Sequence, residues 1–110
     1  MFGFLRGHGG WENISASELQ RRMAGENPPV VIDVREPYEF KQGHIPGAKL
    51  IPLGNLHSQL AKLERAKPHV LVCLSGARSR QACALLAQAG LEELANLSGG
   101  MGAWNGQITR

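Results

Sequence analysis

The chain has 110 residues, of which 43% are hydrophobic and 19% are charged. This composition excludes a disordered chain, a coiled coil and a collagen-like fibre, and the length indicates one domain that folds without a metal or disulfides. Twelve basic and nine acidic side chains leave a net charge of +3. Because the basic residues are scattered, they argue against nucleic-acid binding and suit a small anionic substrate.

We expect neither a membrane span nor a secretion signal in this sequence. No stretch approaches about 18 apolar residues, and the apolar patch before Arg6 is shorter than a signal peptide requires. We therefore predict a soluble, cytoplasmic protein whose thiols stay reduced and which has no membrane partner. We expect residues 1–12 to form a flexible extension, residues 13–106 the domain and residues 107–110 a tail, with the two ends frayed.

Short β-branched runs alternate with helical patterns, which is typical of a parallel sheet covered by helices. The first helix is predicted to begin after Ser15, with Glu18 completing a capping box, and to run to about Gly25. Residues 30–34 are apolar on both faces, as a central parallel strand requires.

The later elements follow the same alternation. They are a short helix over 36–42, a strand over 49–53, a helix that buries Leu56, Leu60 and Leu63, a strand over 69–74, a helix over 79–88, a strand over 94–97, and a turn with a short helix over 99–104. Because Pro52 lacks an N–H donor, the end of the strand over 49–53 lies at a sheet edge or has already left the ladder.

A single thiol, Cys73, lies at the carboxyl end of the buried strand over 69–74 and just before a helix. Ligands bind at this edge in open α/β sheets. The turn over residues 74–78 can form a nest of backbone N–H groups, and the helix dipole adds to it, so both favour a negative charge on the sulfur. A thiol with a pKa of about 8.5 is about 3% ionised at pH 7, whereas one lowered to about 6.5 is about 75% ionised. The alternative is that Cys73 is a small buried hydrophobe.

Three residues of the loop suit an anion site. Gly76 lets the backbone adopt a positive φ and approach a ligand closely. Arg78 can grip a tetrahedral oxyanion through two of its oxygens. Ser79 can cap the helix or donate a hydrogen bond inside the loop.

Three segments of the sequence carry recognisable motifs. They are VIDVRE, YEF and GHIPGA between residues 31 and 48, VCLSGARS over 72–79, and LSGG over 97–100 followed by Trp104. Together they resemble the rhodanese family, specifically its small single-domain sulfurtransferases. The resemblance covers roughly residues 14–104. It implies a three-layer fold with a central five-stranded, mainly parallel sheet, and Cys73 as a catalytic cysteine that carries a persulfide without a metal or organic cofactor.

The resemblance also implies roles for the neighbouring residues. The active-site loop would comprise Leu74, Ser75, Gly76, Ala77, Arg78 and Ser79. Asp33 and Arg35 would form structural ion pairs, with Arg35 nearer the site. The donor would be thiosulfate or a persulfide, and the acceptor cyanide or a thiol, such as glutathione, thioredoxin or a sulfur-carrier protein.

The sequence leaves two alternatives to sulfur transfer. Phosphatases and arsenate reductases of the same broad fold have five residues between cysteine and arginine, whereas four separate Cys73 from Arg78. The smaller loop fits sulfur better than phosphate. A non-catalytic module that binds a partner or senses sulfur or redox state is the other alternative, but such modules commonly lack the cysteine.

The remaining thiol and the histidines are interpreted as structural. Cys83 lies on the flank of an apolar helix face, where a resolving thiol is the alternative. We expect the imidazole of His44 to bond backbone within its turn. No zinc site is predicted, because His8, His57 and His69 share no ligand spacing with the cysteines.

Overall fold

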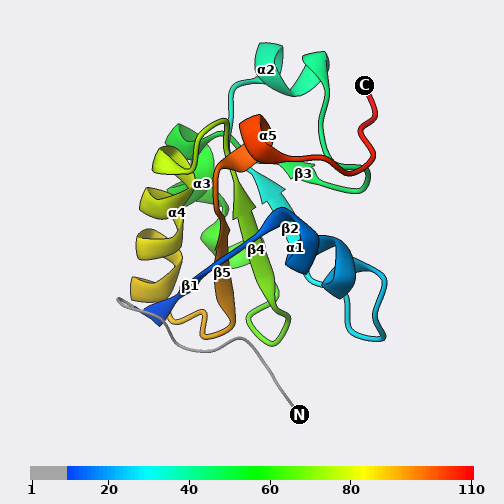
Figure 1. Ribbon diagram of the computed structural model, residues 1–110. Helices are drawn as coiled ribbons and strands as arrows, with labels where there is room; N and C mark the ends of the chain where they lie inside the picture. The colour runs from blue at the N-terminus through cyan, green and yellow to red at the C-terminus, as the bar shows by residue number, and fades with distance from the viewer. Residues whose placement is uncertain (1–9) are drawn as a thin grey trace.

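The computed structural model describes residues 10–110 and contains a five-stranded sheet in which every neighbouring pair of strands is parallel (Figure 1). The strand order is β1-β5-β4-β2-β3. The strands are β1 (Glu12–Ile14), β2 (Val30–Asp33), β3 (Lys49–Leu50), β4 (His69–Val72) and β5 (Leu94–Leu97). The fold predicted from the sequence is confirmed.

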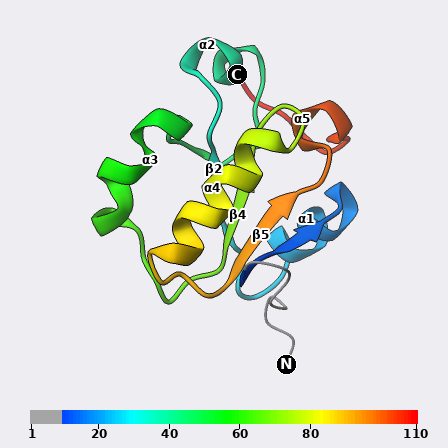
Figure 2. The same cartoon turned by 90° about the vertical axis from the view of Figure 1, so that its left-hand side faces the viewer.

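Helices cover both faces of the sheet (Figure 2). They are α1 (Ala16–Met23), α2 (Pro37–Gln42), α3 (Leu53–Gln59) with the 3₁₀ turn η2 (Leu60–Lys62), α4 (Ala77–Gln88) and α5 (Gly100–Ala103). Helices α3 and α4 pack on one face through Leu56, Ala82 and Leu86. Helix α1 packs on the other through Leu19, with Met101 of α5 beside it.

Alternation along the strands divides the core into two layers, because successive strand residues point to opposite faces. In β4, Leu71 belongs to the layer under α3 and α4, and Val70 and Val72 belong to the layer under α1. Two residues further on, Cys73 continues the Leu71 side. The same period of two places Cys73 against α4.

The first turn of α1 differs from the sequence prediction. Ser15 caps α1 by accepting a hydrogen bond from the Glu18 N–H at 3.1 Å. The carboxylate of Glu18 does not return the bond to Ser15, so the predicted capping box is half formed. The Glu18 carboxylate accepts instead from the guanidinium groups of Arg21 and Arg22, because two positive charges one turn along the helix attract it more strongly than a single N–H does.

Both ends of the described chain are paired. Glu12, which we predicted to lie in the extension, is opposite Ala95 in the β1–β5 ladder. Thr109, which we predicted to fray, forms an isolated antiparallel bridge with His44, and each N–H donates to the partner's carbonyl at 2.9 Å. The first nine residues lie outside the described part. None of the helices formed by residues 10–110 has the length and apolar character needed to span a membrane.

His69 is the first residue of β4, at the end of the strand away from Cys73, and its side chain is 1% exposed. Burial lowers the pKa of His69, although the hydrogen bond between its Nδ1 and the Lys67 carbonyl opposes the shift. The unfolded chain therefore binds a proton below about pH 6.5 that the folded chain binds less readily. We expect the free energy of unfolding to fall as the pH drops below about 6.5, and to fall less in His69→Gln.

Urea unfolding at pH 8 and pH 5 measures this difference. His57→Gln, at an exposed position, is the matched control and should keep the acid sensitivity of the wild type. Equal pH dependence in the wild type and His69→Gln would show that His69 is not responsible.

Candidate active site

Cys73 follows the last residue of β4, and the loop after it leads directly into α4. The side chain of Cys73 is 0% exposed. Gly76 adopts a φ of 108° and caps α4, so the chain reverses sharply and the first N–H groups of α4 turn back toward the sulfur. The positive φ predicted for Gly76 is confirmed.

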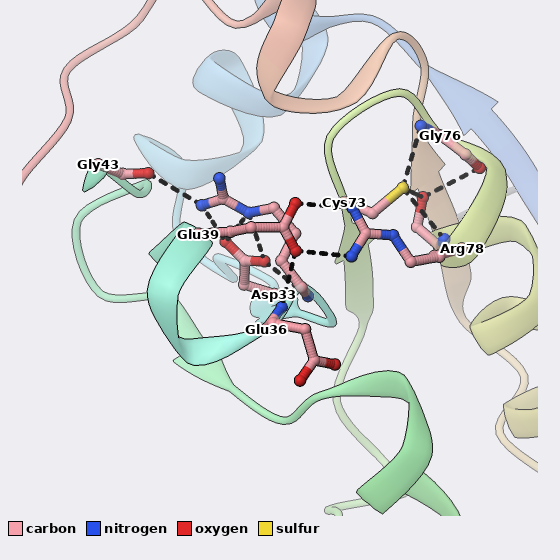
Figure 3. A network of polar contacts seen from close by, with 9 residues as sticks. Asp33, Glu36, Glu39, Gly43, Cys73, Gly76 and Arg78 are labelled. Carbon is pink, nitrogen blue, oxygen red and sulfur yellow. Dashed lines mark hydrogen bonds and ion pairs between the residues drawn. The ribbon is translucent and has the colours of Figure 1, made fainter. Parts of the chain in front are cut away.

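Three hydrogen bonds converge on the Cys73 sulfur (Figure 3). The Gly76 N–H donates to Sγ at 3.0 Å and the Ser79 N–H at 3.3 Å. The Ser79 hydroxyl lies 3.3 Å from Sγ. Ser79 is in the first turns of α4, whose start at residue 77 is two residues earlier than predicted. The sulfur thus lies in a nest of donors that suits an anion.

These donors decide the acidity of the thiol. Burial alone would raise the pKa of Cys73, but the hydroxyl and N–H of Ser79 and the N–H groups of Gly76 and Ser75 outweigh it and lower the pKa. Cys83, also 0% exposed, has no such donors, and burial raises its pKa to about 12. Of the two free thiols, Cys73 is the one whose surroundings favour the thiolate.

The rim of the loop is exposed. Leu74 is 50% exposed, and Ser75 and Ala77 are exposed as well. Among the predicted loop residues, only Gly76 and Ser79 are buried beside Cys73, and Arg78 is partly buried. The rim of the loop is therefore open to solvent, and the Cys73 side chain is buried behind it.

Arg78 points to α2 (Figure 3). Its two terminal nitrogens donate to the Glu39 carboxylate at 2.7 and 2.9 Å. This pairing lowers the pKa of Glu39 to about 2 and raises that of Arg78. Both groups are charged at neutral pH, so the guanidinium fork that we predicted to grip an oxyanion is taken by a carboxylate of the same chain.

Asp33 and Arg35 form the predicted ion pair at the end of β2. The Arg35 Nε donates to Asp33 Oδ1 at 2.9 Å, and Nη2 donates to Oδ2 at 2.8 Å and to the Gly43 carbonyl at 2.9 Å. Asp33 is 1% exposed and Arg35 4%. The Nε and Nη2 atoms of Arg35 are directed to Asp33 and to the turn at Gly43, because a buried carboxylate requires donors. That Arg35 lies nearer the site than Asp33 stays a prediction.

Helix α5 holds the base of the loop, which sequence reasoning missed. The Met101 N–H donates to the Cys73 carbonyl at 2.8 Å, and the Gly102 N–H donates to the Leu74 carbonyl at 2.9 Å. Gly100, with a φ of 56°, lies against the same backbone. The double glycine before Trp104 was the available signal, because it indicates a close approach of backbones.

Asn96 of β5 is the second residue that was missed. It is 0% exposed and its Oδ1 accepts a hydrogen bond from the Ser79 hydroxyl. Its signal in the sequence was one amide within an otherwise apolar strand, LANL. A buried polar side chain requires a partner, so its presence there indicates a polar group on the facing helix.

Other candidate residues have structural surroundings. The Nδ1 atom of His44 lies 2.8 Å from the Phe40 carbonyl oxygen, which confirms the predicted backbone contact. Cys83 lies on α4 and packs within the apolar layer between this helix and the sheet. Within residues 10–110, no three histidine, cysteine or acidic side chains are grouped closely enough to hold a metal ion.

Comparison with known proteins agrees with this geometry. The model of the rhodanese-like domain family matches residues 15–107. A protein named sulfurtransferase from Allochromatium vinosum is 37% identical over 91 residues, which cover 83% of this chain and 85% of the relative. A putative sulfur carrier protein, YrkF of Bacillus subtilis, is 30% identical over 94 residues, which cover 86% of this chain and 51% of YrkF.

A solved structure has the same arrangement of elements. The crystal structure of SSP1007 from Staphylococcus saprophyticus superposes with a TM-score of 0.83 at 30% identity, covering 90% of this chain and 99% of the other. The family match spans β2 to β5, the Cys73 loop and α5 together. The chain therefore belongs to the rhodanese-like domain family.

Proposed function

We propose that this protein is a sulfurtransferase that moves a sulfane sulfur from thiosulfate or a persulfide donor to cyanide or a thiol through a persulfide on Cys73. The observation that carries the proposal is the convergence of the Gly76 N–H, the Ser79 N–H and the Ser79 hydroxyl on the Cys73 sulfur. The two N–H groups donate to a negative sulfur, and the hydroxyl can do so when its proton points to Sγ, at a position where a parallel sheet offers its ligand site.

The reaction divides into two displacements. The Cys73 thiolate attacks the outer sulfur of thiosulfate, a bond forms between the two sulfurs, and the S–S bond of thiosulfate breaks with its electron pair leaving on sulfite. The acceptor then attacks the outer sulfur of the persulfide, and the electron pair of that S–S bond returns to Cys73. Atoms and electrons balance without a redox cofactor.

The loop supports both displacements. Backbone N–H groups of residues 74–78 would hold the anionic outer sulfur as it arrives. Arg78 acts by fixing the loop to α2 through Glu39, since both of its terminal nitrogens are already bonded there. Its positive charge still favours an anion nearby, because Arg78 and the Cys73 sulfur are close enough to interact electrostatically.

The acceptor is proposed to be a thiol of a small molecule or protein. Glutathione, thioredoxin and a sulfur-carrier protein all present a sulfur nucleophile or a terminus that takes sulfur. The relative YrkF is named a putative sulfur carrier protein and contains a segment similar to nearly all of this chain. That combination supports a carrier among the acceptors.

Mass spectrometry of the intact protein tests the proposal. Incubation with thiosulfate, or with glutathione persulfide, is expected to add one sulfur, about 32 Da, and cyanide is expected to remove it. Cys73→Ser should abolish the adduct, because a hydroxyl is a far weaker nucleophile toward sulfur. Cys83→Ala should retain it, since Cys83 is buried in the apolar layer.

Absence of an adduct with every sulfane donor would overturn the proposal and favour a non-catalytic module. Turnover of a phosphate ester or of arsenate in place of sulfur transfer would favour the phosphatase or arsenate reductase alternative. Equal labelling of Cys73→Ser and the wild type would place the sulfur on another residue.

A further inference from the structure

A buried line of polar side chains runs from the Cys73 sulfur to the surface. The Ser79 hydroxyl lies 3.3 Å from Sγ and donates to Asn96 Oδ1. The Asn96 Nδ2 donates to Asn13 Oδ1 at 2.9 Å. Ser79 and Asn96 are 0% exposed, whereas Asn13 is exposed. Asn13 and Asn96 are direct partners in the β1–β5 ladder, so the sheet itself keeps the two amides side by side.

The Ser79 hydroxyl has one proton and three acceptors within reach. They are Asn96 Oδ1, the Gly76 carbonyl at 3.2 Å and the Cys73 sulfur at 3.3 Å. When the hydroxyl donates its hydrogen bond to Asn96 Oδ1, its oxygen presents a lone pair to the sulfur. That suits a neutral thiol, whose S–H can donate to the hydroxyl. It does not suit a thiolate or persulfide anion, which requires a donor.

A half turn of the Asn96 amide removes the conflict, because the oxygen and the NH₂ group of an amide are nearly equal in size. Its Nδ2 then donates to the Ser79 oxygen, and the hydroxyl proton becomes available to the sulfur. The Asn96 Oδ1 atom then faces Asn13. Because Asn13 is exposed, it can turn its own NH₂ group toward this oxygen while water bonds its carbonyl oxygen. Each hydroxyl and amide along the line therefore has a hydrogen-bond partner in both arrangements.

We propose that Asn96 and Asn13 form an amide relay that reverses with the charge of Cys73. In the thiol form, each donor along the line points toward Asn13. In the thiolate or persulfide form, each donor points toward the sulfur. Asn96 is thus a positioning residue that acts through Ser79. The inference rests on the proposed function in that it takes Cys73 as the nucleophile.

The surface position of Asn13 allows a test that leaves the buried site intact. In Asn13→Asp, a carboxylate of the same shape can only accept, so it holds the Asn96 NH₂ group and keeps Asn96 Oδ1 on Ser79. The thiolate then lacks one charge-assisted hydrogen bond, and we expect the pKa of Cys73 to rise by about 1 to 2. Asn13→Ala lets water replace the amide and should raise it much less.

The readout is the rate of alkylation of Cys73 by iodoacetamide as a function of pH, measured in a Cys83→Ala background. The negative charge introduced by Asn13→Asp could also act through space, and salt distinguishes the two effects. A through-space effect shrinks between about 0.05 M and 1 M NaCl, because the Debye length falls to about 3 Å, whereas a held amide does not respond. A rise that disappears at high salt would overturn the relay.

A double-mutant cycle with Ser79→Ala completes the test. If the relay acts through the Ser79 hydroxyl, Asn13→Asp should have no further effect on the pKa of Cys73 once that hydroxyl is absent. Equal effects with and without Ser79 would overturn the inference. If wild-type Cys73 takes up sulfur but the effects of Asn13→Asp and Ser79→Ala on its pKa are independent, the relay alone is contradicted. If wild-type Cys73 takes up no sulfur, the proposed function is contradicted.

Discussion

Gly100→Ala is expected to destabilise the protein by about 2–5 kcal/mol and to slow sulfur transfer by about a hundredfold. Gly100 has a φ of 56°, where a residue with a side chain is strained. A Cβ atom there would lie 2.6 Å from the carbonyl carbon and oxygen of Leu74 and closer still to the Cys73 carbonyl oxygen. These are backbone atoms that cannot swing aside, so the loop itself must move.

Urea unfolding and steady-state sulfur transfer from thiosulfate to cyanide measure the two effects. Gly54→Ala is the matched control, because a Cβ there has no atom within 4 Å and the backbone is helical. The control should be neutral or slightly stabilising. Wild-type activity in Gly100→Ala would contradict the conclusion that α5 fixes the loop.

Arg35→Met is expected to destabilise the protein by about 3–5 kcal/mol, which lowers the midpoint of thermal unfolding by roughly 15–25 °C. It leaves the Asp33 carboxylate, 1% exposed, without its guanidinium partner, and the Gly43 carbonyl without the bond from Nη2. An uncompensated buried charge is costly, whereas an exposed ion pair contributes little.

The double variant Asp33→Ala with Arg35→Met separates charge from packing. It should recover a large part of the loss, because the unpaired carboxylate is gone. Arg35→Lys should be intermediate, since an ammonium group cannot make the two parallel bonds of the fork. If the double variant loses as much unfolding free energy as the two single variants together, Arg35 does not stabilise the protein through its ion pair.

Local patterns in the sequence predicted most of the elements. The β-branched runs at Val30 and Val70 became central strands, and Ser15 caps α1 as expected. Strand β1 was not found from the residues, because three residues, ENI, contain too little alternation to distinguish a strand from a loop. The strand over 49–53 shortened to Lys49–Leu50, since it pairs only with the end of β2.

Partners far apart in the chain were beyond local patterns. Arg78 was predicted to bind an oxyanion, yet it bonds Glu39, which lies 39 positions away. Asn96 and Asn13 are 83 positions apart and meet only because β1 and β5 are neighbours in the sheet. Neither pairing has a sequence spacing that would reveal it, since both depend on the order of strands and the packing of α2 against the loop.

The sequence alone determined where the proposed nucleophile, Cys73, lies. A buried strand, a glycine that can take a positive φ and a helix start leave Cys73 at the carboxyl edge of the sheet, because these preferences act within a few residues. The tertiary structure decided how charge is shared around the thiol. Directed hydrogen bonds depend on atoms being about 3 Å apart, and only packing brings Glu39, Asn96 and α5 to that distance from the loop.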